Sequence, residues 1–170
     1  MRVAVIALII LVNVIVETTL FPFLKLNGVA PDIMTTFIVS FGLLGGNPIA
    51  PIVGLIGGFV YDMVMGSVLG VYALQYMLIG FIIGSIADKF FIGDIIVPMF
   101  FSILAIFFKE TIMLIYAFFM RLDVSAYSIL IKIMIPKAIY TAILMPFIYQ
   151  FMQWLYRYKF MTKKLYFKEN

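Results

Sequence analysis

Seven polar or charged side chains interrupt the long apolar stretches of this 170-residue chain, and any chemistry would start from them. A polar group inside a membrane is costly, so such residues are hypotheses for proton or substrate paths. The structural alternative is that the charges pair between helices and fix helix register, or extend toward the membrane surface at helix ends. The residues concerned are Asn13, Glu17, Gln75, Lys109, Glu110, Lys132 and Lys137.

The spacing of these residues limits which of them can meet. Asn13 and Glu17 are four positions apart, so they share one face of a helix. Lys109 and Glu110 are adjacent and point about 100° apart, so they cannot both face one partner. One of the two could meet Glu17 and the other Lys137. The functional and the structural interpretations both remain open at this point.

The residue types that are missing exclude several kinds of site. The chain has no Cys and no His, which removes disulfides, thiol nucleophiles and imidazole bases. It contains no phosphate-binding glycine loop and no serine elbow. Asp88 and Asp94 supply too few oxygens for a calcium shell. We therefore expect no catalytic residue, no cofactor and no metal, although carboxylate-only chemistry remains open.

Composition indicates an integral membrane protein, because 65% of the residues are hydrophobic and 12% are charged. A membrane-crossing helix needs about 20 residues, and the apolar stretches predict an all-α, polytopic bundle of about six such helices. Their expected ranges are 3–24, 32–44, 49–65, 71–87, 95–120 and 129–154. The second and third are short and could instead form a broken or re-entrant pair.

Domain organisation and topology follow from the same pattern. We expect one transmembrane domain over residues 1–155 and a basic cytoplasmic tail over residues 156–170. With an even number of spans, both termini lie in the cytoplasm of the cell membrane. A basic tail beside a last span is explained better by topology and anionic lipids than by nucleic-acid binding.

Small residues recur every four positions through the centre of the chain. Glycines four apart allow two helix backbones to approach closely in a membrane. Asp62 lies inside this series and is expected to face protein or water. The helix-packing seam is formed by Gly54, Gly58, Gly80 and Gly84.

One block of this region is similar to a known family. It begins after Pro31-Asp32 and runs Gly54-x3-Gly58-x3-Asp62-x3-Gly66-x3-Gly70-x-Tyr72-Ala73-Leu74-x-Tyr76-x3-Gly80-x3-Gly84. This pattern resembles the rod shape-determining protein MreD family. The motif covers about residues 30–90, and the remainder matches by hydropathy, size and the basic C-terminus.

The resemblance implies a non-catalytic component of the bacterial cell-elongation machinery that builds peptidoglycan. The implied partners are the bitopic protein MreC, the actin-like MreB, and the wall synthases RodA and the elongation penicillin-binding protein. The family is thought to share its fold with the substrate-binding components of energy-coupling-factor transporters. A substrate-binding subunit of a vitamin-type transporter is therefore the alternative function.

A partner surface is expected at the turn between the third and fourth predicted helices. Glycine seams suit a partner helix as well as a neighbouring one, and tyrosines combine contact area with a polar tip. The predicted partner-binding residues are Asp62, Gly66, Gly70, Tyr72 and Tyr76.

Overall fold

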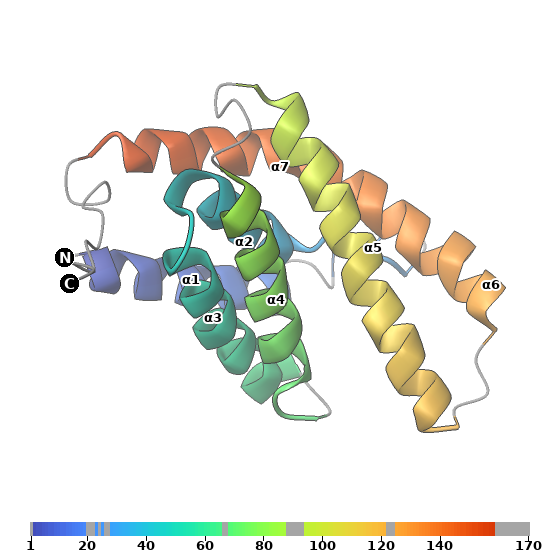
Figure 1. The fold of residues 1–170 in the computed structure, drawn as a ribbon. Coiled ribbons are helices and arrows are strands. Elements are labelled where there is room, and N and C mark those ends of the chain that lie inside the picture. Colours follow the sequence, from blue (N-terminus) through green and yellow to red (C-terminus); the bar gives the residue numbers. More distant parts are fainter. Residues whose placement is uncertain are drawn as a thin grey trace.

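Every regular element in the described part of the chain is a helix (Figure 1). The computed structural model describes residues 2–19, 23, 25, 28–65, 68–87, 94–121 and 125–158. The elements are α1 Arg2–Thr19, α2 Ile33–Gly45, α3 Ile49–Met65, α4 Val71–Ile86, α5 Ile96–Phe119, α6 Ala126–Ile129, the π-helix η2 Leu130–Met134, and α7 Ile135–Tyr156. The bounds of α2 to α5 agree with the expected ranges to within one residue at each end, whereas α1 ends at Thr19, before the expected residue 24. The predicted basic tail beyond Tyr158 lies outside the described residues.

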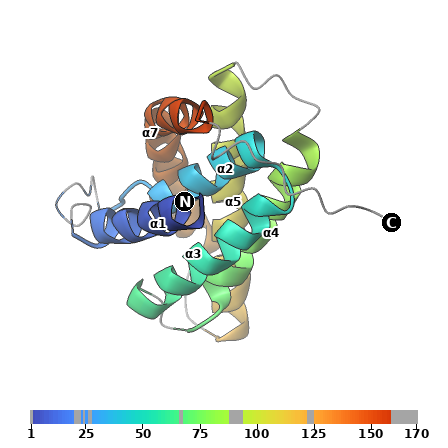
Figure 2. The same cartoon turned by 90° about the vertical axis from the view of Figure 1, so that its left-hand side faces the viewer.

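Helix α2 forms the centre of the molecule. It contacts α1, α3, α4, α5 and α7, and Figures 1 and 2 show these helices around it. Its side chains are apolar or small, and two of its three buried hydroxyl groups bond within the helix. Thr36 donates to the Ile33 carbonyl at 2.6 Å, and Ser40 donates to the Thr36 carbonyl at 2.8 Å. These two hydroxyl groups are satisfied inside the helix, whereas the buried Thr35 hydroxyl has no hydrogen-bond partner. Helix α2 is buried nearly all round.

Helices α3 and α4 lie backbone to backbone at the glycine positions. A Cβ atom added at Gly58 would lie 2.5 Å from the Ala73 Cα atom, and one added at Gly80 would lie 2.6 Å from the Ala50 carbonyl oxygen. An added Cβ at Gly54 would collide with the Tyr76 carbonyl. At Gly84 it would lie 2.6 Å from the Asn47 side-chain oxygen. The close approach of these two helices therefore requires glycine at the seam.

Two helices are long and apolar enough to cross a membrane by length and composition. They are Ile96–Phe119, with 24 residues, and the continuous helix Tyr127–Tyr156, with 30 residues, which includes η2. The π-helical turn Leu130–Met134 lies directly before Pro136, where the ring would otherwise crowd the preceding turn. Pro146 lies inside α7. The other apolar helical stretches are shorter, with 13 to 17 residues each: Val3–Thr19, Ile33–Gly45, Ile49–Met65 and Val71–Ile86.

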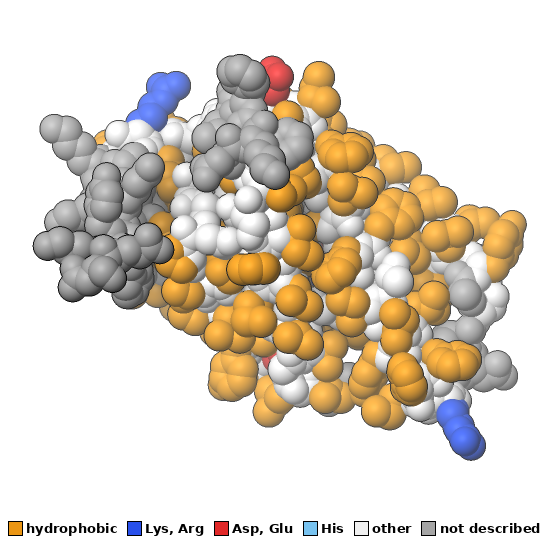
Figure 3. Space-filling model, in the orientation of Figure 1, with side chains coloured by type: hydrophobic (Ala, Val, Ile, Leu, Met, Phe, Trp, Pro, Cys, Tyr) orange, Lys and Arg blue, Asp and Glu red, His pale blue; other side chains and the backbone are white. Residues whose placement is uncertain are grey.

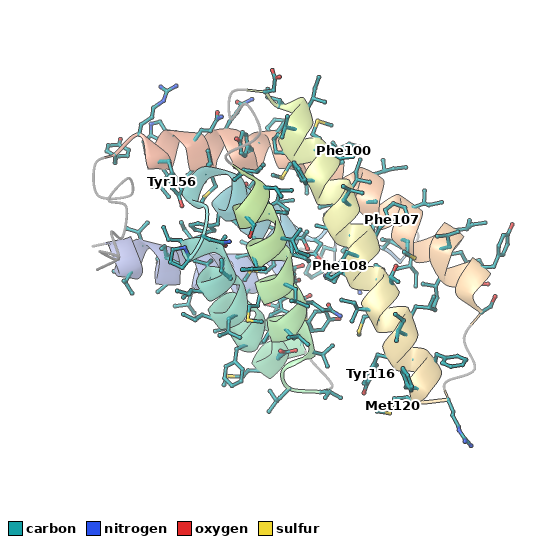
Figure 4. The ribbon with its side chains drawn as sticks, viewed as in Figure 1. Phe100, Phe107, Phe108, Tyr116, Met120 and Tyr156 are labelled. Atoms are coloured by element: carbon teal, nitrogen blue, oxygen red, sulfur yellow. The ribbon has the colours of Figure 1, made fainter. Side chains whose placement is uncertain are left out.

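The outer surface of the bundle is apolar. Figure 3 shows hydrophobic side chains across the face, with Lys and Arg at two opposite ends. The side chains of Phe100 and Phe108 on α5, and of Met120 directly after it, are exposed (Figure 4). No described residue of α5 after Glu110 is buried, and in Figure 1 this end of α5 extends past α4 together with α6. An apolar exterior of this extent suits a lipid environment.

Candidate functional site

The polar centre of the molecule is built on Asp32, the residue directly before α2. The Asp32 side chain caps the helix by accepting a 2.8 Å hydrogen bond from the Thr35 backbone amide. An aspartate at this position satisfies an amide that the helix itself leaves unpaired. The Asp32 backbone amide donates to the Thr141 hydroxyl of α7 at 3.0 Å. The start of α2 is thus attached to α7.

Lys109 of α5 and Tyr76 of α4 complete this buried cluster. The Lys109 ammonium forms an ion pair with the Asp32 carboxylate and donates to the Tyr76 hydroxyl at 3.1 Å. The Tyr76 hydroxyl in turn lies 3.3 Å from Asp32 Oδ1, to which it can donate. The ammonium also lies 5.0 Å from the centre of the Tyr76 ring, within cation–π range. Three helices therefore meet at one charge-assisted network.

A second ion pair joins α5 to α7. Lys137 Nζ lies 2.7 Å from Glu110 Oε1, with side-chain exposures of 22% and 10%. This is one of the pairings that the sequence left open. Lys109, in contrast, pairs with Asp32 and not with Glu17, the other pairing that the sequence left open. Adjacent residues thus serve different neighbours because they point in different directions around α5.

The other predicted intramembrane polar residues differ in their surroundings. Glu17 is buried, and its Oε2 atom has no hydrogen-bond partner. Asn13 and Gln75 are also buried, and both amide atoms of each lack a partner. Lys132 is exposed. No hydrogen bond between described residues therefore connects the Asn13 or Gln75 side chain to the ion pairs.

A cavity of about 280 Å³ opens beside Glu17. It lies between the segment that precedes α2, the end of α3 and the start of the last long helix. Both signs of charge line it. Its walls comprise Glu17, Lys25, Gly28, Val29, Ala30, Pro31, Tyr61, Met65, Ile133 and Lys137.

Asp62 occupies a second polar site, at the turn between α3 and α4. Its carboxylate accepts hydrogen bonds from three backbone amides, those of Gly70 at 3.0 Å, Tyr72 at 3.1 Å and Ala73 at 3.0 Å. Gly70 has a φ of 98°, a conformation that favours glycine. The residue before α4, Gly70, makes no side-chain capping hydrogen bond. The buried Asp62 carboxylate, which belongs to α3, caps the start of α4 instead.

The predicted partner-binding residues fall into two groups around this turn. Asp62 and Tyr76 are buried, whereas Gly70 and Tyr72 are partly exposed. Gly66 lies outside the described residues. The tyrosine rings of the two helices pack together, with centroids 5.0 Å apart for Tyr61 and Tyr72. Among the described residues of the turn, the exposed side chains are those of Val68 and Leu69, neither of which was predicted as a partner-binding residue.

Asp32 is a central site residue that was not predicted from the sequence. The available signal was an aspartate directly before an apolar helix, combined with an intramembrane lysine that needed a partner. Among the described residues, no group of three or more Asp, Glu, His or Cys side chains could hold a metal ion. The site contains carboxylates, amines and phenols that are bonded to one another, an arrangement suited to holding helices together.

Comparison with known protein families identifies the chain. The model of the rod shape-determining protein MreD family matches residues 1–158. No curated protein and no solved structure gives a match. Because the match covers most of the chain, this protein belongs to the MreD family, a family of membrane proteins that determine rod shape.

Proposed function

We propose that this protein is a non-catalytic membrane scaffold of the cell-elongation complex. In this proposal it binds an MreC-like bitopic protein and connects it to MreB, RodA and the elongation penicillin-binding protein. Membership of a rod-shape family supports the general role. The buried Lys109–Asp32 pair and the partly buried Lys137–Glu110 pair support a structural rather than a catalytic use of the charged side chains.

The proposal includes six membrane crossings, with both termini in the cytoplasm. Helix α2 has 13 residues and is about 20 Å long, shorter than a hydrocarbon core of about 30 Å. It is enclosed by other helices, so its ends need not reach the membrane surface themselves. The polar network around Asp32 satisfies its first turn inside the bundle. A short central helix is therefore compatible with a six-pass bundle.

The feature that supports a partner surface best is the apolar turn between α3 and α4. Val68 and Leu69 are 42% and 65% exposed there, next to Tyr72. The hydrogen bonds that three backbone amides donate to the Asp62 carboxylate fix the backbone of this turn. A fixed backbone lowers the entropy cost of binding, because the surface is already ordered before the partner arrives. We call Val68, Leu69, Gly70 and Tyr72 the turn surface.

The buried members of the predicted site have a supporting role in this proposal. Asp62 holds the turn from beneath, and Tyr76 packs behind Tyr72 with ring centroids 6.1 Å apart. Tyr76 is itself held by its hydroxyl contacts with Asp32 and Lys109. The turn surface is thereby connected to the central charge cluster through Tyr76, and also directly, because the Lys109 ammonium lies 5.3 Å from the centre of the Tyr72 ring.

The test is recovery of the bitopic partner with tagged protein from native membranes. Leu69→Ala should lower partner recovery several-fold, because truncating a central interface side chain removes buried contact area. Leu8→Ala is the matched control, since Leu8 is 61% exposed on α1 and lies outside the turn surface. The two variants are compared at equal expression, after their unfolding temperatures have been measured and found equal.

Two results would reject the scaffold role. In the first, Leu69→Ala and Tyr72→Ala both retain the bitopic partner at the level of Leu8→Ala. In the second, the purified protein carries an ATPase pair and no wall-synthesis protein. That second result would favour the transporter subunit, the alternative function that the sequence left open.

A further inference from the structure

The exposed face of α7 changes from apolar to charged toward the end of the helix. Phe147 and Phe151 are exposed, and Trp154 and Tyr158 follow them on the same face with exposures of 51% and 44%. Arg157 is exposed beside these two residues. Apolar rings, rings with a polar tip and then a charge are the order in which side chains meet the hydrocarbon, the headgroups and the water of a membrane. This order indicates that the end of α7 lies at headgroup level.

The rings on this face contact one another and rest on the bundle. The Phe151 and Trp154 rings stack with centroids 6.2 Å apart, and the Trp154 and Tyr158 rings meet edge to face at 5.1 Å. On the opposite side of the same turns, Met152 and Leu155 are buried in a cluster with residues of α1, α2 and α3. The bundle therefore holds the aromatic face in place before any ligand arrives, which lowers the entropy cost of binding.

Positive charge collects directly after these rings. Five of the twelve lysine and arginine residues of the chain follow Trp154, together with one glutamate. Helix α1 begins with Arg2 at the same end of the molecule (Figures 1 and 2). The two ion pairs between described residues do not include Arg157, so no described residue neutralises its guanidinium. The five basic residues are Arg157, Lys159, Lys163, Lys164 and Lys168.

We propose that this end of α7 binds the phosphate groups of anionic phospholipids. The Arg157 guanidinium presents N–H donors that match phosphate oxygens, and the lysines that follow it in the sequence add positive charge. The Trp154 and Tyr158 rings set the depth, because their polar tips favour the headgroup layer. An acidic protein segment would match the charge, but it would not explain why an exposed aromatic face leads to it. The site depends on the membrane location of the chain and not on the scaffold role.

Trp154 allows a local test, because it is the only tryptophan of the chain. The full chain is reconstituted into vesicles of equal parts phosphatidylglycerol and phosphatidylcholine, with quenching bromine atoms on the acyl chains of one lipid at a time. The loss of Trp154 fluorescence then reports which lipid lies beside it. We expect phosphatidylglycerol to be enriched about fivefold or more, the size of one basic side chain at an anionic surface. In about 1 M salt, where the screening length is about 3 Å, the enrichment should largely disappear.

Substitutions separate the charges from the rings. Arg157→Gln removes one charge and keeps the fluorescent reporter, so it should lower the enrichment about twofold to fivefold. The triple variant that also carries Lys163→Gln and Lys164→Gln should bring the enrichment close to one. Arg121→Gln is the matched control, because Arg121 is exposed just after α5, on the side of the molecule away from the end of α7 (Figure 1).

The proposal is overturned if bromine on either lipid quenches Trp154 equally in the folded wild-type chain. That result would assign the basic residues to an acidic protein partner. It is also overturned if the triple variant keeps the wild-type enrichment, if high salt leaves the enrichment unchanged, or if Arg121→Gln lowers it as much as Arg157→Gln. Because the vesicles contain no other protein, none of these outcomes depends on the scaffold role.

Discussion

The Lys109 ammonium and the Asp32 carboxylate form an ion pair in the interior of the bundle, with exposures of 2% and 1%. The two residues are 77 positions apart, one within α5 and the other at the start of α2. A buried ion pair contributes little compared with an apolar pair of equal volume, but loss of one partner leaves an uncompensated charge. The pair therefore fixes where α5 lies along α2.

Removal of either partner of this pair should destabilise the protein. We expect Lys109→Met or Asp32→Asn to lower the free energy of unfolding by about 3–5 kcal/mol, because the remaining charge stays buried. The double variant should recover most of that loss. Unfolding of the purified protein in detergent, followed by circular dichroism against denaturant, measures the effect. Lys132→Met is the matched control, since Lys132 is exposed on the adjoining helix.

The Glu110–Lys137 pair tests charge pairing at a place that is less buried than the Lys109–Asp32 pair. We expect Glu110→Lys or Lys137→Glu alone to destabilise the α5–α7 contact, because each places like charges together. The charge-swapped double variant should regain stability, with a coupling energy of about 0.5–3 kcal/mol. A double-mutant cycle on unfolding free energies measures this value. Strictly additive effects would show that the 2.7 Å contact contributes no coupling.

Adjacent glycines of α3 should respond differently to the same substitution. A Cβ at Gly58 meets the α4 backbone, with the Tyr72 carbonyl oxygen at 2.7 Å, so Gly58→Ala should separate the helices and lower the unfolding temperature. A Cβ at Gly57 meets the terminal methyl group of Met34, a flexible chain end that can move aside. Gly57→Ala is therefore the milder variant. Equal losses in the two variants would contradict the backbone-contact explanation.

Asp62 should control the order of the turn surface. Asp62→Ala removes the acceptor of three amides, which at a helix start costs about 0.5–2 kcal/mol or somewhat more. Asp62→Asn keeps one oxygen and should have a smaller effect. Hydrogen exchange of peptides covering residues 68–76 should be faster in Asp62→Asn than in the wild type, and fastest in Asp62→Ala. Unchanged exchange in Asp62→Ala, with the rest of the bundle protected, would mean that the turn is held by other contacts.

Much of the fold could be predicted from hydropathy and turn residues. Apolar stretches of helical length, separated by glycine, proline and charged residues, locate α2 to α5 closely, because each helix satisfies its own backbone in an apolar environment. The four-residue glycine spacing indicates a close helix pair, and α3 and α4 lie together at those glycines. The motif from Pro31 to Gly84 also indicated the family that the chain belongs to.

The partners of the polar residues were decided only by the tertiary structure. Sequence spacing shows that Lys109 and Glu110 point in different directions, but not which helix each one faces. Asp32 reads as a helix cap, and only the approach of α4 and α5 turns it into the centre of an ion-pair network. In the same way Asp62 and Tyr76 lie beneath the turn rather than on it. Local pattern sets each helix and its faces, whereas the choice of neighbour depends on contacts between residues far apart in the chain.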